Sequence, residues 1–361
     1  MTASGRHSSY ERFPYIPSGP RRECAAGWDA ICAALGGSGA RVVVVDAYTG
    51  VAGSDLLSLV KGLDPELSIP AGDALRSPEE IERMLHPYVT DDPVFGRIAE
   101  LGLLDLFDPH RLRLLREEIE ACEGRVVVYG AGASLLADGD VLVYADMPRR
   151  EEVLRQRRHE SAPLGASRPR DDPALAYKRS FFVDWRICDA HRRALLGRAD
   201  HVLDTTAAGA PKMIEGRTLL RSLHDLARRP FRVVPFFDPA PWGGRWLMEV
   251  CDLDRDAVNY GWAFDCVPEE NSLLLGFGDA RFETPALNLV HQAQEPLLGP
   301  HVLETFGAEF PIRFDFLDTM EGGNLSLQVH PTSRYIGETF GMRYTQDESY
   351  YLMDAAPDAG V

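Results

Sequence analysis

Basic residues are scarce in this sequence compared with acidic ones. The 361 residues include 38 lysines and arginines but 55 aspartates and glutamates, so the formal net charge is −17 at pH 7. Proteins that bind nucleic acids present a basic face that neutralises phosphates, so this balance argues against nucleic acid as a main partner. Acidity of this kind supports solubility and indicates no particular activity.

Closely spaced cysteines and long apolar runs are also missing. The six cysteines lie at positions 24, 32, 122, 188, 251 and 266. No two of them have Cys-x-x-Cys spacing, so the sequence indicates neither a redox motif nor a thiolate zinc site. There is no apolar run of about 18 residues and no apolar segment near the start, so we expect no signal peptide, no membrane span and no membrane partner. We therefore expect a cytoplasmic protein with reduced thiols.

The sequence contains two regions that differ in residue pattern, as expected for a chain long enough to build two domains. The first, residues 38–229, has four β-branched runs that predict buried strands, over 41–46, 125–130, 141–146 and 201–204. Helical patterns lie between them, over 78–85, 109–122 and 151–159. Strands that alternate with helices predict an α/β domain with a parallel sheet covered on both faces. We expect residues 1–22 to be poorly structured, with a short helix over 25–35 completing a lead of residues 1–37.

Two glycine turns follow the predicted strands. The first, over 46–55, places Gly50, Gly53 and Ser54 between a strand and a helix, where a phosphate-cradling loop would lie. It lacks the Gly-Lys-Ser/Thr ending of a P-loop, and the second turn, over 130–134, lacks the third glycine of a dinucleotide motif. Plain strand-to-helix geometry also suits either turn, so nucleotide binding and a structural role both stay open.

An arginine-rich helix follows the predicted strand at 141–146. It opens near Arg149, and a strand followed by such arginines is similar to the lid region of nucleoside and nucleotide kinases, in which arginines meet the transferred phosphate. The order of elements over 38–228 likewise resembles a P-loop kinase fold and implies a nucleotide partner. The candidate nucleotide-binding residues are Gly50, Gly53, Ser54 and Arg149. The alternative is a solvated helix held by pairs such as Glu151 with Arg155.

Beyond residue 230 the sequence turns to short aromatic-rich strands with Pro and Gly turns. In the run over 324–331, Gln328 and His330 stand two residues apart, so on a strand both side chains point to the same face. Glu348 follows in a second predicted strand, over 346–352. One nitrogen and two oxygen donors suit zinc or another divalent metal.

Four short sequence motifs follow one another in this region. They are Pro241-Trp242-Gly243-Gly244, Leu297-Leu298-Gly299, Phe310-Pro311 with the strand after it, and Leu325-Ser326-Leu327-Gln328-Val329-His330-Pro331. This order resembles the first half of type I mannose-6-phosphate isomerases, which are metal-dependent cupins. The resemblance covers residues 230–361 and implies a partial cupin, or jelly-roll, domain. It also implies a zinc or other divalent metal on Gln328, His330 and Glu348, with Ser326 and Gln346 near a sugar-phosphate substrate.

The sequence departs from that family at several positions. Gln346 stands where the family has a lysine by the substrate, and either Arg313 or Asp315 replaces a second lysine. The family's fourth metal ligand, a later histidine, has no counterpart, and no catalytic base is indicated. Because a cupin closes its sheet, a sheet that stopped after Glu348 would leave edges bare. We expect the sequence to be a fragment of a longer protein; the alternatives are a partner chain that completes the barrel and a decayed domain. The oligomeric state is not indicated.

Three functions follow as hypotheses. The first is a metal-dependent aldose–ketose isomerase that interconverts mannose 6-phosphate and fructose 6-phosphate, in which the metal stabilises charge on the sugar oxygen. The second is a nucleotide-dependent sugar or nucleoside kinase that acts through residues 38–229. The third is a non-catalytic regulator that binds sugar phosphates.

Overall fold

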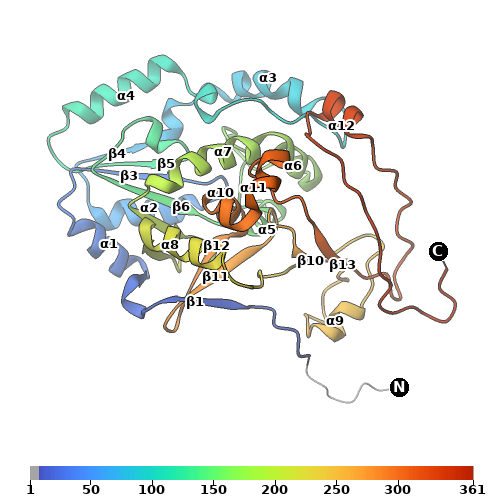
Figure 1. Cartoon of the computed structure of the whole chain (residues 1–361). Coiled ribbons are helices and arrows are strands. Elements are labelled where there is room, and N and C mark those ends of the chain that lie inside the picture. Colours follow the sequence, from blue (N-terminus) through green and yellow to red (C-terminus); the bar gives the residue numbers. More distant parts are fainter. Residues whose placement is uncertain (1–7, 361) are drawn as a thin grey trace.

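One large sheet organises the protein (Figure 1). The structure is a computed structural model, and it describes residues 8–360. Within these residues the sheet has seven strands. In spatial order they are β2 (Cys24–Ala26), β8 (Lys212–Glu215), β7 (His201–Asp204), β6 (Val141–Asp146), β3 (Val42–Ala47), β5 (Val126–Gly130) and β4 (Leu67–Pro70). The five strands from β7 to β4 are parallel to one another. At the other edge, β8 is antiparallel to β7, and β2 is antiparallel to β8. The predicted α/β class with a parallel sheet is therefore confirmed, and the four predicted strands are β3, β5, β6 and β7.

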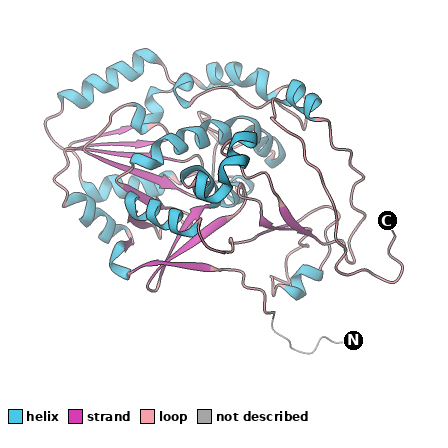
Figure 2. Ribbon diagram, viewed as in Figure 1, coloured by secondary structure: helices cyan, strands magenta, loops and turns pink. Residues whose placement is uncertain are grey.

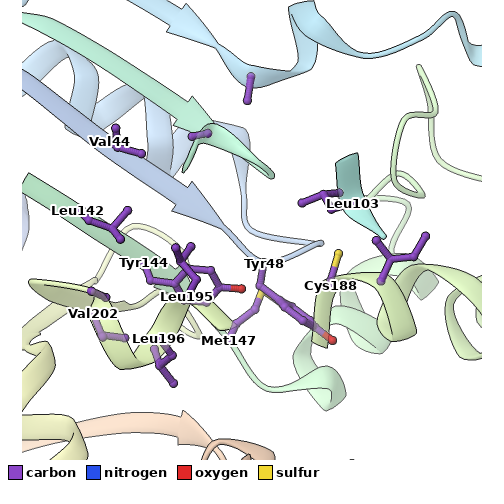
Figure 3. Packing of buried hydrophobic residues seen from close by; sticks show 14 of the residues in the cluster. Val44, Tyr48, Leu103, Leu142, Tyr144, Met147, Cys188, Leu195, Leu196 and Val202 are labelled. Carbon is purple, nitrogen blue, oxygen red and sulfur yellow. The ribbon is translucent and has the colours of Figure 1, made fainter. Parts of the chain in front are cut away.

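Helices cover both faces of the sheet because its buried strands carry apolar side chains on alternate sides. Val43 and Val45 pack with α1 (Trp28–Gly36) and α2 (Gly53–Leu63). Val42 and Val44 belong to the opposite apolar layer. The helices of that layer are α3 (Pro78–Val89), α4 (Pro109–Ala121), α7 (Trp185–Leu195), α8 (Gly216–Leu226) and α10 (Ala286–Gln292). Figure 3 shows its centre, where side chains of α7 pack on β6 and β7.

The chain between β6 and β7 builds a helical cover for the carboxyl ends of the strands. It forms α5 (Arg149–Arg157), α6 (Pro173–Arg179), the π-helix η5 (Ser180–Asp184) and then α7. Tyr48 and Met147, which follow β3 and β6, lie beside Cys188 and Leu195 of α7 (Figure 3). This cover decides what can reach the strand ends. Among the residues described, no helix combines the length and the apolar character needed to cross a membrane.

Two smaller sheets follow in the later part of the chain. In one, β1 (Tyr15–Gly19) is parallel to β11 (Ser272–Phe277), which is antiparallel to β12 (Ala280–Pro285). In the other, β10 (Trp262–Cys266) lies between β9 (Phe236–Asp238) and β13 (Phe314–Leu317), all antiparallel. Three further helices follow in the later part of the chain, α9 (Trp246–Val250), α11 (Gln294–Phe306) and α12 (Ser333–Phe340), the last of which lies near α3 (Figure 1).

The N-terminal segment, residues 8–22 of the described chain, is more ordered than the sequence predicts. Residues 1–7 lie outside the described part, but β1 pairs with β11 and β2 extends the large sheet. The prediction of a poorly structured lead is therefore wrong for β1, because its backbone finds a strand edge that lies far away in the sequence. Ile16 of β1 and Phe282 of β12 share the apolar layer of Val44, so residues on both sides of the predicted boundary at 229 build one core.

The predicted strands at 324–331 and 346–352 are absent. Both segments are extended coil, seen as pink loop at the far side from the large sheet in Figure 2. Alternating sequence alone does not make a strand, because each strand needs hydrogen bonds to a neighbour, and neither segment has such a partner in the described chain. Leu327 and Val329 are consequently 99% and 90% exposed.

Replacing Phe282 with Ala tests whether the hairpin β11–β12 and the large sheet unfold as one unit. Phe282 is fully buried in the shared core, so we expect the free energy of unfolding to fall by about 3–5 kcal/mol. Denaturant titrations followed by circular dichroism and by tryptophan fluorescence should shift together. Val258→Ala is the control, because Val258 is 82% exposed. If the Phe282→Ala variant unfolded in two separate transitions, and the larger transition kept the denaturant midpoint of the unchanged protein, a common core would be contradicted.

Candidate functional site

The first glycine turn lies where an α/β sheet usually binds ligands. β3 and β6 are neighbours, but the chain leaves β3 towards β4 and leaves β6 towards β7, on opposite sides. Ligands of open α/β sheets bind at the carboxyl ends of two strands that diverge in this way. The turn follows β3 directly, so the sequence prediction places Gly50, Gly53 and Ser54 at this point.

Helix α5 closes over the glycine turn. Gly50 has a φ of 83°, and a Cβ atom there would lie 2.7 Å from Cγ of Glu152. The carboxyl group of Glu152 accepts hydrogen bonds from Thr49 Oγ1 at 3.1 Å and from Trp185 Nε1 at 2.6 Å. Burial raises the pKa of Glu152 to about 8, and this group is 1% exposed. A protein carboxyl group therefore lies against the turn that was predicted to cradle a phosphate.

Arg149 is committed to a buried ion pair. Its guanidinium donates to Asp189 and lies 4.8 Å from the centre of the Trp185 ring. Burial alone would raise the pKa of Asp189, but the charges of Arg149 and Arg192 outweigh it and hold that pKa at about 2. Tyr48 also donates to Asp189, at 2.9 Å. Arg149 and Gly50 are thus brought to the same strand ends, although protein groups already contact both.

The other arginines of α5 also form specific contacts. Arg155 is 2% exposed and reaches the carbonyl oxygens of Gly50 and Thr205, besides the predicted pair with Glu151. Two more arginines connect α5 to the later sheets, through the pairs Arg150 with Glu283 and Arg157 with Asp238. The interpretation of this helix as a solvated face is wrong, because Arg149 and Arg155 are buried. Sequence periodicity gives no sign of this, since every partner except Glu151 is distant in the sequence.

The second glycine turn is held by an acidic side chain that the sequence argument did not single out as a ligand. Asp46, at the end of β3, accepts hydrogen bonds from the backbone N–H groups of Gly132 and Ser134, at 3.1 and 2.9 Å. His191 Nε2 lies 2.9 Å from the same carboxylate. Asp46 therefore fixes the turn after β5, which supports the structural reading of the motif at 130–134.

The candidate metal ligands meet only in part. His330 Nε2 lies 2.8 Å from Glu348 Oε2, and His330 Nδ1 lies 3.0 Å from the carbonyl oxygen of Gln346. Both ring nitrogens therefore face oxygen acceptors. The contact is that of a His–Glu pair, and it brings together two of the three predicted metal ligands.

The remaining predicted residues stay apart from this pair. Gln328 and Ser326 are exposed and form no hydrogen bond or ion pair within residues 8–360. Asp315 of β13 lies near Glu348, and burial followed by the charge of Glu348 raises its pKa. In the part of the chain that the structure describes, no group of three or more His, Cys, Asp or Glu side chains is placed to hold a metal ion. A metal on His330 and Glu348 would need another donor, such as the amide oxygen of Gln328.

Two surface hollows lie away from all of these residues. One, of about 580 Å³, separates α1 from α2 near Trp28 and Lys61. The other, of about 550 Å³, lies beside the start of β3 near Arg41 and Arg116. No predicted site residue lines either hollow, so neither supports the predicted sites.

A family model described as a domain of unknown function, DUF8485, matches residues 27–228, more than half of the chain. The chain belongs to this family. The matched range includes all strands of the large sheet except β2, together with α5 and α7, and it ends before β9. The glycine turns and the buried ion pairs are thus parts of the DUF8485 domain, whereas His330 and Glu348 lie outside it. A search of curated proteins finds no match to the chain.

Two glycines of the first turn should differ sharply in their tolerance of a methyl group. We expect Gly50→Ala to lower the free energy of unfolding by about 1–3 kcal/mol, because Gly50 is left-handed and contacts Glu152. Gly53→Ala is the matched control: it begins α2 in open space, so stability should stay equal or rise slightly. Denaturant titration measures both. Equal effects of the two changes would mean that α5 does not close on the turn.

Glu152 should make stability depend on pH. Its folded pKa of about 8 lies above the ordinary value of 4.5, so the folded state holds the proton more tightly. This contribution is complete below pH 4.5 and is lost as the pH rises to about 8. Glu152→Gln should therefore gain stability relative to the unchanged protein as the pH rises from about 4.5 to about 8, in thermal melts. Glu118→Gln is the control: Glu118 is exposed on α4, so the melting temperature of this variant should depend on pH as that of the unchanged protein does. If the melting temperature of Glu152→Gln also followed the same pH dependence, the raised pKa would be refuted.

Proposed function

We propose that the chain is a metal-dependent aldose–ketose isomerase of the mannose-6-phosphate isomerase type, with mannose 6-phosphate and fructose 6-phosphate as its substrate pair. The observation that supports this most is the contact of 2.8 Å between His330 Nε2 and Glu348 Oε2. Two of the three ligands implied by the sequence resemblance thus come together from separate segments. The antiparallel sheet of β9, β10 and β13 precedes them and would form part of the proposed partial cupin.

The donor set suits zinc or another divalent metal. An imidazole nitrogen and a carboxylate oxygen bind zinc at roughly 2.0–2.2 Å, which places two such donors about 3.3–3.6 Å apart in a tetrahedral site. The observed pair, 2.8 Å apart, would have to open by about half an ångström or more, and both side chains are partly exposed. The carbonyl of Gln346 orients the histidine ring through Nδ1, as outer partners of metal-bound histidines commonly do. Tyr350 contributes a hydrogen bond to Glu348.

The bound metal would act as a Lewis acid that stabilises negative charge on the sugar oxygen during proton transfer between neighbouring carbons. The residues of this chain would contribute to binding and orientation: His330 and Glu348 would hold the cation, and Gln346 would fix the ring. Gln328 is a further oxygen donor, two residues before His330. Because Glu348 would be a metal ligand, a separate group would serve as the base.

A nucleotide-dependent kinase is the second candidate, favoured by the position of the glycine turn at the diverging strands β3 and β6. In that reading the parallel sheet is a P-loop-kinase-like fold. Two contacts oppose nucleotide binding: Glu152 lies against Gly50, and Arg149 is paired with Asp189. The turn also lacks the lysine that meets the phosphates in a P-loop. We therefore rank this candidate below the isomerase.

Conversion of mannose 6-phosphate to fructose 6-phosphate in the presence of zinc tests the proposal. His330→Ala should lower turnover and zinc affinity by about 100-fold or more, because it removes the nitrogen donor. His301→Ala is the matched control, since His301 is exposed on α11 and should change neither quantity. Zinc binding is measured by calorimetry. Turnover that survives in the His330→Ala variant would reject this site.

The same assay separates the alternatives. Zinc-dependent binding of mannose 6-phosphate without turnover would favour the sugar-phosphate-binding regulator. Thermal stabilisation by ATP, reduced by the change Gly53→Val, would favour the kinase.

A further inference from the structure

The two candidate metal ligands lie at the ends of one loop. His330 and Glu348 meet at 2.8 Å, and residues 331–347, which we call the strap, connect them. Within the described chain neither ligand belongs to a strand, so no ladder of hydrogen bonds fixes the distance between them. The separation of the two ligands therefore depends on how the strap is held.

The middle of the strap docks on the DUF8485 domain. It forms helix α12, which lies near α3 (Figure 1). The N–H group of Ile98 donates to the carbonyl oxygen of Phe340 at 2.8 Å. Arg97 Nη1 donates to the carbonyl oxygen of Glu338 at 2.8 Å, and the rings of Phe95 and Phe340 lie 5.4 Å apart. These contacts join the carboxyl end of α12 to the segment of the domain that follows α3.

A second anchor follows α12. Arg343 Nη1 donates to the carbonyl oxygen of Phe306, at the end of α11, at 2.9 Å. The rings of Tyr344 and Phe306 lie 5.0 Å apart. This anchor is two residues before Gln346, whose carbonyl oxygen lies 3.0 Å from His330 Nδ1. The end of the strap that contacts the histidine is thus attached to the body of the protein.

Helix α12 depends on its docking contacts. It has eight residues, from the N-cap Thr332 to the left-handed C-cap Gly341. Isolated helices shorter than about 12–15 residues are marginal in water, so α12 needs its neighbours to stay folded. Thr332 stands two residues after His330. If α12 undocked and unfolded, the start of the strap would lose its fixed position beside the first metal ligand.

An undocked strap would weaken metal binding at its ends. A flexible loop loses conformational entropy each time its two ends are brought to one ion, whereas a docked loop has already lost it. Docking and metal binding then favour each other, because each supplies part of the order that the other requires. Such a coupling is reciprocal: the factor by which docking raises metal affinity is the factor by which metal favours docking.

We propose that docking of the strap on the DUF8485 domain positions His330 and Glu348 for the metal ion, and that bound metal tightens the docking in return. This coupling rests on the proposed metal site. It makes Arg97 a positioning residue, which acts on the ligands through its contact with α12. The same segment donates from the N–H group of Ala99 to the carbonyl oxygen of Phe182 in η5, at 2.8 Å. The strap therefore connects the metal site with the helical cover of the strand ends.

Calorimetric titration with zinc chloride tests the coupling in the unchanged protein and in Arg97→Ala. Loss of the contact with Glu338 should weaken zinc binding by about fivefold or more, in the usual range of coupling between two sites. Arg83→Ala is the matched control: Arg83 is exposed on α3 and forms no hydrogen bond or ion pair in the described chain, so zinc affinity should change less than about twofold. A thermal melt confirms that each variant is folded. Equal zinc affinity in the two variants would overturn the coupling and leave the metal site standing, whereas no zinc binding by the unchanged protein would reject both.

Hydrogen exchange at the backbone amide of Ile98 measures the reverse effect. This amide donates to Phe340 of α12, so docking protects it and undocking exposes it. Zinc should slow its exchange by about fivefold or more in the unchanged protein and leave it unaltered in His330→Ala. Nuclear magnetic resonance follows this single amide. Exchange at Ile98 that does not respond to zinc, in protein that calorimetry shows to have bound zinc, would contradict the coupling.

Discussion

The buried ion network at the carboxyl ends of β3 and β6 is the constraint on which the rest of the structure depends. Arg192 donates to Asp146 at 3.2 Å and to Asp189 at 2.7 Å, and Arg149 completes the chain of charges. Asn288 of α10 donates to Asp146 at 2.7 Å. Removal of one partner from such a network leaves a buried charge uncompensated, at a cost of about 3–5 kcal/mol. The network thereby determines which helices, α5, α7 and α10, cover the strand ends.

The same network explains why the crevice of the large sheet offers little room for a ligand. An open α/β sheet leaves backbone N–H groups and polar side chains at its diverging strands, and here protein carboxyl groups occupy that position. Glu152 lies against the first glycine turn and Asp46 holds the second. The proposed metal site lies instead beyond the matched range 27–228, at His330 and Glu348.

The sequence predicts the four central strands of the large sheet, β3, β5, β6 and β7, because short apolar runs need cover on both faces. It misses β2, β4 and β8, which are short or of mixed polarity. It also fails at 324–331 and 346–352, since a strand is a property of two paired segments and the pattern of one segment cannot supply the other. The pair of His330 and Glu348 could be predicted from a motif. The burial of Arg149 could not, because its partner Asp189 is 40 residues away and reaches it only through the packing of α7 on α5.

The pairing of β1 with β11 also imposes an order of events on synthesis. Ile16 is opposite Leu275, more than 250 positions later in the sequence. A ribosome adds roughly 5–20 residues each second, so this first strand waits on the order of 10–50 s for its partner. During that interval its apolar side chains and unpaired backbone are available to other proteins. Strand β1 is therefore open to chaperones and to mispairing until β11 has been made.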